Sequence, residues 1–320
     1  MIQRLGALLV AALWVLALPA APADAATDAV AVGVHAESFV DHSRSTPSDV
    51  VAGIAPESER RLPTTIFYPA RGEAAADGDA VRDARPRSGR YPLVLFAGGA
   101  PGAPIDYAPL LQHWAAAGYV VAAPAFPVSS FAGPDAVAYT DLPRQSEDLR
   151  FVLRRVLALD AKQEGIASID GKHIAVAGHS LGGQTALSLV AKCCRDSRVD
   201  VALVLAGVTD ATDGPALHKL KGPALFVHSR NDRAVPYQPA LHTCATVSGW
   251  KRMLTVERVR GLRARTDPYL GKSQYASIVQ PATVAFLDGY MRDSASARHR
   301  LSRVGTGTDL AGLSRCRVGA

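Results

Sequence analysis

The stretch that decides the fold of this chain is HIAVAGHSLGGQTAL, residues 173–187. Its apolar start, central glycines and helix-forming end predict a short strand, a sharp turn and then a helix. Gly178 and Gly182 have no Cβ atom, so the strand and the helix can approach closely around a strained Ser180 at the tip of the turn. Such a G-x-S-x-G elbow exposes the serine Oγ above a sheet and points the next N–H, that of Leu181, at a developing oxyanion. We therefore interpret Ser180 as a nucleophile.

Strand and helix patterns alternate on both sides of this elbow, which is typical of a mostly parallel central sheet with helices on both faces, the α/β class. Besides the elbow strand, the predicted strands are 29–34, 64–68, 91–96, 119–123, 201–205, 223–228 and 253–259. The first two are expected to be antiparallel and the last is expected to be the final strand. Besides the elbow helix, the predicted helices are 107–117, 143–159 and 281–292.

The chain of 320 residues is expected to contain one domain, over residues 26–320. Within it, a polar surface loop is expected at 72–90 and a basic tail from about residue 293. Residues 1–25 predict a signal peptide, because Arg4 precedes an apolar run and Ala23-Asp24-Ala25 forms a cleavage site. The expected location is therefore secreted or in the cell envelope. No later segment has the length or polarity of a membrane-spanning helix.

The cysteines fit an exported protein with up to two disulfides. There are four of them, Cys193, Cys194, Cys244 and Cys316, and they allow three connectivities among which the sequence does not choose. Metal ligation is the rival interpretation, but no Cys-x-x-Cys or His-x-x-x-His spacing supports a site. We predict no metal and no cofactor.

The net charge is +6, and the basic residues are spread along the chain with Arg-rich stretches at 60–61, 258–265 and the C-terminal tail. Such charges form a solvated surface or attract anionic envelope polymers and lipid surfaces. No nucleic-acid-binding motif accompanies them. The expected partners are therefore an acyl ester substrate and, peripherally, the cell envelope.

Several motifs around the elbow resemble one branch of the α/β-hydrolases, the dienelactone-hydrolase and platelet-activating-factor-acetylhydrolase-like proteins. This branch includes exported actinobacterial esterases, lipases and cutinase-like polyester hydrolases. The motifs are TIFYP at 65–69, DYAPL at 106–110, GYVVAAP at 118–124, GHSLGG at 178–183 and CRD at 194–196. The resemblance extends over nearly all of residues 60–292 and implies an α/β-hydrolase fold.

The resemblance also implies the partners of Ser180. The segment VHSRNDRAVP, residues 227–236, matches the loop that carries the acid, and Asp232 matches the acid itself. Asp210 and Asp213 are the reserve acids. The second oxyanion donor is expected from the turn after the strand 91–96, where relatives have a His-Gly pair and this chain has Gly98-Gly99-Ala100. The backbone N–H of Ala100 is the donor by this correspondence, and Gly98 is expected to loosen the turn.

The general base departs from the pattern of the family. Relatives carry a histidine after the last strand, but no histidine occurs here between His242 and His299, and Arg265 stands at the expected place. An arginine stays protonated and cannot accept the serine proton. The base is therefore either another histidine brought close by the fold or missing.

Three hypotheses follow from these residues. The first is an exported serine esterase, lipase or cutinase-like hydrolase that works through an acyl-enzyme on Ser180. The second is a non-catalytic relative that binds acyl, polyester or envelope material or a partner protein, and the third is acyl transfer or perhydrolysis on the same scaffold. The short connection from 205 to 223 predicts no large lid, which favours bulky or surface-presented substrates.

Overall fold

The computed structural model describes residues 30–73, 75, 79–131, 141–160, 165–191, 195–207, 220–259 and 273–317. The strands are β1 (Val30–Asp41), β2 (Arg60–Glu73), β3 (Val81–Arg82), β4 (Arg90–Ala97), β5 (Val120–Pro124), β6 (Ser168–His179), β7 (Val201–Leu205), β8 (Ala224–Ser229), β9 (Lys251–Val256) and β10 (Ala311–Ser314). The helices are a 3₁₀ turn η1 (Pro104–Tyr107), α1 (Ala108–Ala116), α2 (Leu142–Asp160), α3 (Leu181–Ser188), α4 (Tyr237–Thr246), α5 (Ala276–Met291) and α6 (Ala295–Ser302).

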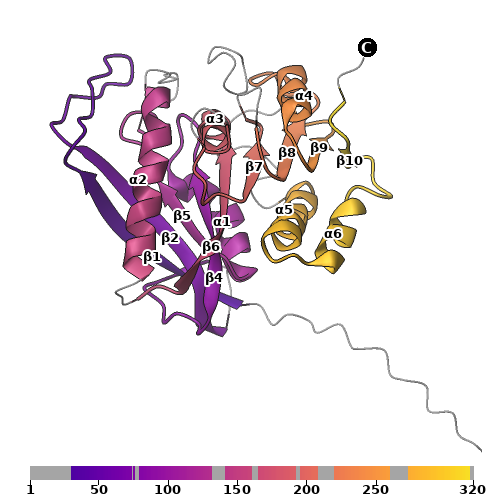
Figure 1. The fold of residues 1–320 in the computed structure, drawn as a ribbon, viewed down its shortest axis with the longest axis horizontal. Coiled ribbons are helices and arrows are strands. Elements are labelled where there is room, and N and C mark those ends of the chain that lie inside the picture. Colours follow the sequence, from indigo (N-terminus) through magenta and orange to yellow (C-terminus); the bar gives the residue numbers. More distant parts are fainter. Residues whose placement is uncertain are drawn as a thin grey trace, which may run out of the picture.

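All these strands form one sheet in the order β10-β9-β8-β7-β6-β4-β5-β2-β1-β3. The six strands from β5 to β9 in this order are parallel to one another. β2 is antiparallel to both β1 and β5, and β10 is antiparallel to β9. The predicted mostly parallel sheet with two antiparallel opening strands is thus confirmed (Figure 1).

Two apolar cores cover the two faces of the sheet. Side chains alternate along a strand, so Val176 of β6 enters one core with α2, α3 and α4, while its neighbour Ala177 enters the other with α1, α5 and α6. The apolar stripe predicted for residues 143–159 lies on α2, where Leu149, Val152 and Val156 are fully buried. Helices on both faces, as predicted, leave the strand ends free to carry a site.

The C-terminal region differs from the prediction. The segment expected to be a basic tail contains α6 and a further edge strand, β10, so the strand predicted at 253–259 is not the final one. β10 reads AGLS, which has little strand propensity, and it forms through pairing with β9 and through a disulfide between Cys316 and Cys244 of α4. The Cα atoms of this pair are 5.7 Å apart.

Two smaller differences concern element boundaries. Part of the polar loop predicted at 72–90 is ordered, because β3 pairs with β1 and Ala70 bridges Pro86. α5 begins at Ala276 rather than at Pro281, because Ser273 accepts N–H bonds from Tyr275 and Ala276 at 3.2 Å and so starts the helix earlier. The prediction placed the start at Pro281 because proline is favoured in the first turn of a helix.

A buried ion cluster joins the sheet to the start of α2. The guanidinium of Arg60 on β2 is fully buried and donates to both oxygens of Asp148, at 2.7 and 2.6 Å, and to Asp141 at 2.7 Å. Arg44 contacts Asp148 from the β1–β2 connection at 2.9 Å. Burial raises the pKa of the Asp148 carboxyl, so this carboxylate depends on its cationic partners.

We expect Arg60→Ala to lower the free energy of unfolding by about 3–5 kcal/mol, because it leaves buried carboxylates without their main counter-charge. The neighbouring Arg61 is the matched control, since its side chain is 56% exposed in its pairs with Glu57 and Glu59. Arg61→Ala is expected to cost less than about 1 kcal/mol. Urea denaturation followed by circular dichroism measures both values, and equal costs would contradict the structural role of the buried cluster.

Candidate active site

The elbow predicted around Ser180 is present at the carboxyl end of β6. Ser180 has φ 52° and ψ −122°, a conformation that residues other than glycine rarely adopt. Its N–H donates to Leu205 of β7 at 3.0 Å, and its carbonyl accepts the N–H of Gly183 at 2.9 Å. The residue is only partly buried. The strained backbone therefore presents the Ser180 side chain at the strand edge, outside the packed interior.

The glycines on either side of Ser180 explain how the turn closes. A Cβ atom on Gly178 would lie 2.0 Å from the carbonyl oxygen of Gly182, and one on Gly182 would lie 2.1 Å from that of Ala97. Both distances are far shorter than any van der Waals contact. β6 and α3 can therefore meet at this angle only with glycine at both positions.

The turn that follows β4 lies against the elbow. Ala97 is opposite Gly178 in the parallel register, and a Cβ atom on Gly99 would lie 2.9 Å from the Cβ atom of Ser180. Ala100 is the next residue and is partly exposed, while Leu181 begins α3 on the other side of the serine. The structure thus brings the two predicted donors, Ala100 and Leu181, to the same end of the sheet as Ser180.

A tyrosine anchors this turn, and the sequence did not indicate it. The N–H of Gly99 donates to the hydroxyl of Tyr107 at 2.8 Å, and this hydroxyl is 3.0 Å from Nδ1 of His179. Tyr107 is fully buried and His179 nearly so. The expectation that Gly98 loosens the turn is therefore countered by Tyr107, which ties the turn to the elbow residue before Ser180. The DYAPL motif at 106–110 contains this tyrosine, but the sequence by itself assigned it no contact.

Asp232 lies in the loop after β8, as the resemblance implied. Its Oδ1 accepts the N–H groups of Ala234 and Val235, both at 2.9 Å, and its side chain is only 3% exposed. β7 separates β8 from β6 in the sheet, and neighbouring strands lie about 4.8 Å apart, so the ends of β6 and β8 are roughly 10 Å apart. A group that bridges Ser180 and Asp232 must therefore lie over the end of β7.

His228, the second-to-last residue of β8, is the imidazole beside this acid. Its Nε2 donates to the carbonyl of Val235 at 2.8 Å and is 3.8 Å from Oδ2 of Asp232. The ring is buried and contacts Tyr237 edge to face. These contacts hold His228 within the acid loop, on the far side of β7 from Ser180. Within the described part of the chain, no imidazole hydrogen-bonds to the Ser180 hydroxyl.

Other predicted residues are far from the site or outside the described ranges. His173 lies near the middle of β6, six residues before His179, and it hydrogen-bonds to Asp170 at 2.7 Å. The described residues contain no group of three or more potential metal ligands, and no helix among them is long and apolar enough to cross a membrane. The residues outside the described ranges include the predicted signal peptide 1–25, Cys193, Cys194, Asp210, Asp213, His218 and Arg265.

Comparison with known proteins agrees with this geometry. Residues 81–232 match the family model named Chlorophyllase, a range that is just under half of the chain and contains the β4 turn, Ser180 and Asp232. A solved ferulic acid esterase from Streptomyces cinnamoneus is 25% identical over 92% of this chain and 98% of its own, with a TM-score of 0.65. No curated protein sequence matches the chain.

The fold, the elbow and the matches agree with one another. The parallel sheet places a strained serine after its central strand, between a glycine-rich turn on one side and an acid loop two strands away on the other. The family model spans these same three elements. The chain belongs to the α/β-hydrolase superfamily.

Proposed function

We propose that this protein is a carboxylic ester hydrolase that works through an acyl-enzyme on Ser180. The observation that carries the proposal is the backbone of Ser180 at φ 52°, which holds a side chain at the strand edge at a cost in conformational energy. Strain of this kind is retained where it serves a function. The likeness to a ferulic acid esterase and to the chlorophyllase model supports ester chemistry.

The chemistry follows from the positions of the residues. The Oγ of Ser180 attacks the acyl carbonyl, its proton passes to a base, and the N–H groups of Ala100 and Leu181 hold the oxyanion. The alcohol then leaves with a proton, and water attacks the acyl-enzyme to release the acid. Asp232 orients the base and stabilises its protonated form. The base itself must reach across the end of β7.

Labelling with a serine-reactive fluorophosphonate tests this proposal. An activated Ser180 is expected to react stoichiometrically, with the added mass found on the peptide that contains residues 178–183. The label attaches to Ser180 without turnover of any ester, so the readout does not depend on the identity of the natural substrate. Absence of label under conditions that modify a known serine esterase would remove the proposed mechanism.

We also propose export through the segment 1–25, which is supported by its signal-peptide pattern and by the Cys244–Cys316 disulfide. Disulfides form and persist in oxidising compartments outside the cytosol. A basic surface, with a net charge of +6, fits contact with anionic envelope material. An exported esterase of this kind would meet its ester substrate outside the cell.

A second candidate function is a non-catalytic binding protein on the same scaffold. The observation in its favour is the absence of any histidine between His242 and His299. We expect Arg265→His to raise the hydrolysis rate of p-nitrophenyl acetate at least about tenfold, because general-base catalysis contributes about 10²–10⁴-fold when the base is well placed. Arg263→His is the control two residues away. An equal response of both variants would contradict the assignment of position 265.

The bond from Tyr107 to the turn leads to another expected result. Tyr107→Phe removes the hydroxyl that holds the Gly99 N–H, so the neighbouring Ala100 N–H is expected to drift from the oxyanion position. We expect kcat to fall about tenfold with KM nearly unchanged, since losing an oxyanion donor outright costs about 10²–10³-fold. Tyr91→Phe, which removes an exposed hydroxyl bonded to Ser88, is the control. A rise in KM with constant kcat would show that Tyr107 acts on ground-state binding instead.

A further inference from the structure

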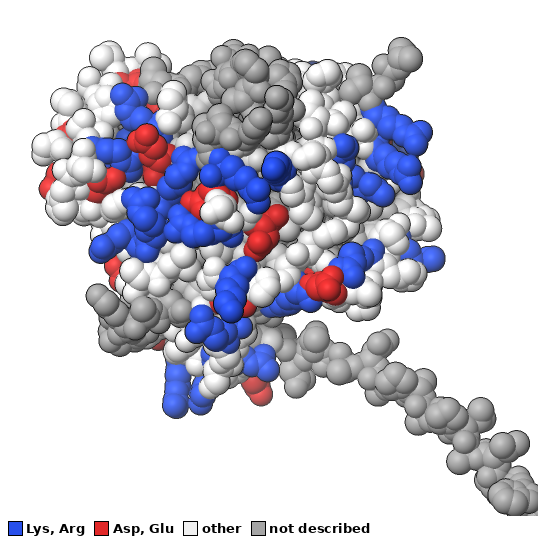
Figure 2. Space-filling model, in the orientation of Figure 1, with Lys and Arg blue, Asp and Glu red and all other residues white. Residues whose placement is uncertain are grey.

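A cationic pocket lies at the edge of the sheet formed by β9 and β10. It has a volume of about 330 Å³ and is lined by Gly249, Lys251, Arg252, Arg315, Cys316 and Arg317. Four of these six residues are cations and none is an acid. Figure 2 shows Lys and Arg side chains gathered on this part of the surface, where Figure 1 draws β10 and the C-terminal segment.

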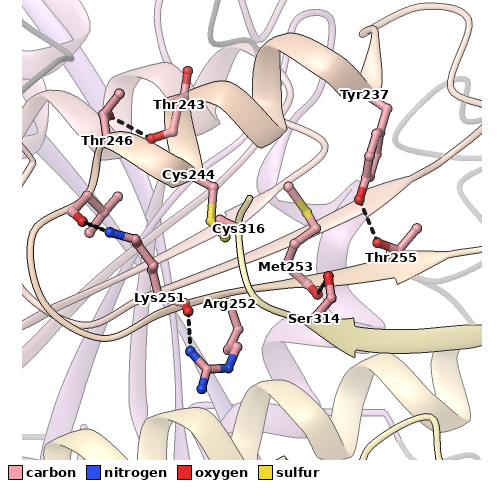
Figure 3. The surroundings of a disulfide bond; sticks show 11 residues. Tyr237, Thr243, Cys244, Thr246, Lys251, Arg252, Met253, Thr255, Ser314 and Cys316 are labelled. Carbon is pink, nitrogen blue, oxygen red and sulfur yellow. Dashed lines mark hydrogen bonds between the residues drawn. A yellow bond between two sulfur atoms is a disulfide. The ribbon is translucent and has the colours of Figure 1, made fainter. Parts of the chain in front are cut away.

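Among the described residues, no carboxylate pairs with these four cations. Within the described ranges, none of them forms an ion pair, whereas Arg198, Arg230 and Arg292 elsewhere on the surface do. Neutral groups hold two of the pocket cations in place instead. Lys251 Nζ donates to the carbonyl of Val247, and Arg252 donates to that of Lys251 at 2.8 Å (Figure 3). The pocket therefore keeps its positive charge while part of its lining is already ordered.

The aromatic ring beside Arg252 orders it further. The guanidinium lies 5.3 Å from the centre of the Trp250 ring, which itself packs against Tyr290 of α5 at 4.6 Å. A stacked arginine loses less conformational freedom when it binds an anion than a freely moving one does. Its remaining donors can pair with two oxygens of one oxyanion.

The disulfide holds the other two cations in position. Cys316 is 7% exposed and is bonded to Cys244 of α4, while its neighbours Arg315 and Arg317 are both exposed. The chain around Cys316 is thereby fixed against the start of β9 (Figure 3). Without this bond, only the four-residue strand β10 would hold the segment in place.

The pocket is remote from the candidate active site. Lys251 is the first residue of β9, opposite Ala224 at the start of β8, so the pocket lies at the amino ends of these strands. Ser180 and Asp232 lie beyond the carboxyl ends of β6 and β8. A ligand in the pocket would therefore leave the candidate active site, at the opposite ends of the strands, accessible.

We propose that this pocket binds a soluble ligand with several phosphoryl groups. Arginine recognises phosphate oxygens in a bidentate manner, and four cations without a carboxylate partner among the described residues call for more than one negative charge. The volume lies at the lower end of small-molecule sites, about 300–1,000 Å³, so the pocket exceeds the needs of a single ion. The proposal does not depend on the proposed ester hydrolysis.

Isothermal titration of the full chain with inorganic tripolyphosphate tests the proposal. We expect saturable binding at one site, and the variant Arg315→Gln/Arg317→Gln is expected to weaken it at least about tenfold, since each hydrogen bond to a charged group contributes about 1.5–3 kcal/mol. The matched control is Arg85→Gln/Arg87→Gln, two exposed arginines with the same spacing and the same change in charge. This control is expected to retain the wild-type affinity. An equal loss in both variants would show general electrostatic attraction and overturn the proposal.

Two further ligands test whether the pocket prefers phosphoryl groups to carboxylates and a soluble ligand to a lipid surface. Tricarballylate carries three carboxylates and is expected to bind at least about tenfold more weakly than tripolyphosphate, because it carries fewer negative charges and fewer acceptor oxygens. Vesicles of phosphatidylglycerol present the same phosphoryl chemistry on a membrane. One contrary result is that the protein cosediments with these vesicles, loses this binding in Arg315→Gln/Arg317→Gln, and binds no tripolyphosphate. That result would replace the soluble ligand by a lipid surface and overturn the proposal.

The disulfide gives an independent measurement. Cys244→Ser/Cys316→Ser is expected to weaken tripolyphosphate binding at least about fivefold, because the segment with Arg315 and Arg317 must then be ordered on binding. Circular dichroism and urea denaturation report whether the rest of the domain is intact. Unchanged affinity in a folded variant would show that the disulfide does not position the pocket.

Discussion

Ser180→Ala is expected to lower ester turnover by at least about 10³-fold while leaving the fold unchanged. In a serine protease the loss of the nucleophile costs about 10⁶-fold, and the remaining rate comes from binding and the oxyanion hole. The expected loss here is smaller because the serine and its base act as a unit, and this chain has no histidine between His242 and His299 to serve as that base. Initial rates with p-nitrophenyl acetate and butyrate measure this effect.

The control for this experiment is Ser277→Ala. Ser277 is exposed on α5 and hydrogen-bonds only within its own helix turn, to Gln274 at 2.7 Å. The control should therefore retain the full rate. If the wild-type protein and Ser180→Ala hydrolyse both esters equally fast, Ser180 is not the nucleophile. If neither the wild-type protein nor the variants hydrolyse the esters faster than buffer alone, the result supports the hypothesis of a non-catalytic binding protein.

Gly182→Ala is expected to have the largest effect on stability. The added Cβ atom would lie 2.1 Å from the carbonyl oxygen of Ala97 and 2.4 Å from that of Gly98, both of which are backbone atoms that cannot rotate away. Relief requires α3 to move from β4, which would disturb the elbow and the core below it. We expect a loss of more than about 3 kcal/mol in the free energy of unfolding, or failure to fold.

Gly312→Ala is the matched control for this substitution. Gly312 lies in β10, where an added Cβ atom would meet nothing within 4 Å. Its free energy of unfolding, measured by urea denaturation, is expected to stay within about 0.5 kcal/mol of that of the wild type. A Gly182→Ala variant as stable as this control would mean that the helix and the strand do not meet as closely as the structure shows.

The local parts of the candidate site could be predicted from the sequence. The elbow, the turn after β4 and the loop after β8 each lie within a few residues, and their glycines and apolar runs reflect constraints that act at short range. Pattern alone thus indicated the elbow at Ser180, the turn that contains Ala100 and the loop that contains Asp232, and their roles in catalysis stay a prediction.

Contacts between distant segments could not be predicted in this way. The anchoring of Gly99 by Tyr107 and the contact of Tyr107 with His179 join residues up to 72 positions apart. The ion cluster of Arg60 and Asp148 joins residues 88 positions apart. Neither contact produces a periodic pattern in the sequence. A single tyrosine or arginine looks the same there whether it is buried or exposed.

What the sequence by itself determined is the class of the fold and the position of the strained elbow at Ser180, since hydrophobic periodicity and glycine placement are local properties. Only the tertiary structure decided that the C-terminal segment joins the sheet as β10, that Cys244 pairs with Cys316, and that four cations surround one pocket. AGLS is too short and too weakly apolar to specify a strand alone. Its conformation depends on the edge of β9 and on a cysteine in α4, which become neighbours only after the rest of the domain has folded.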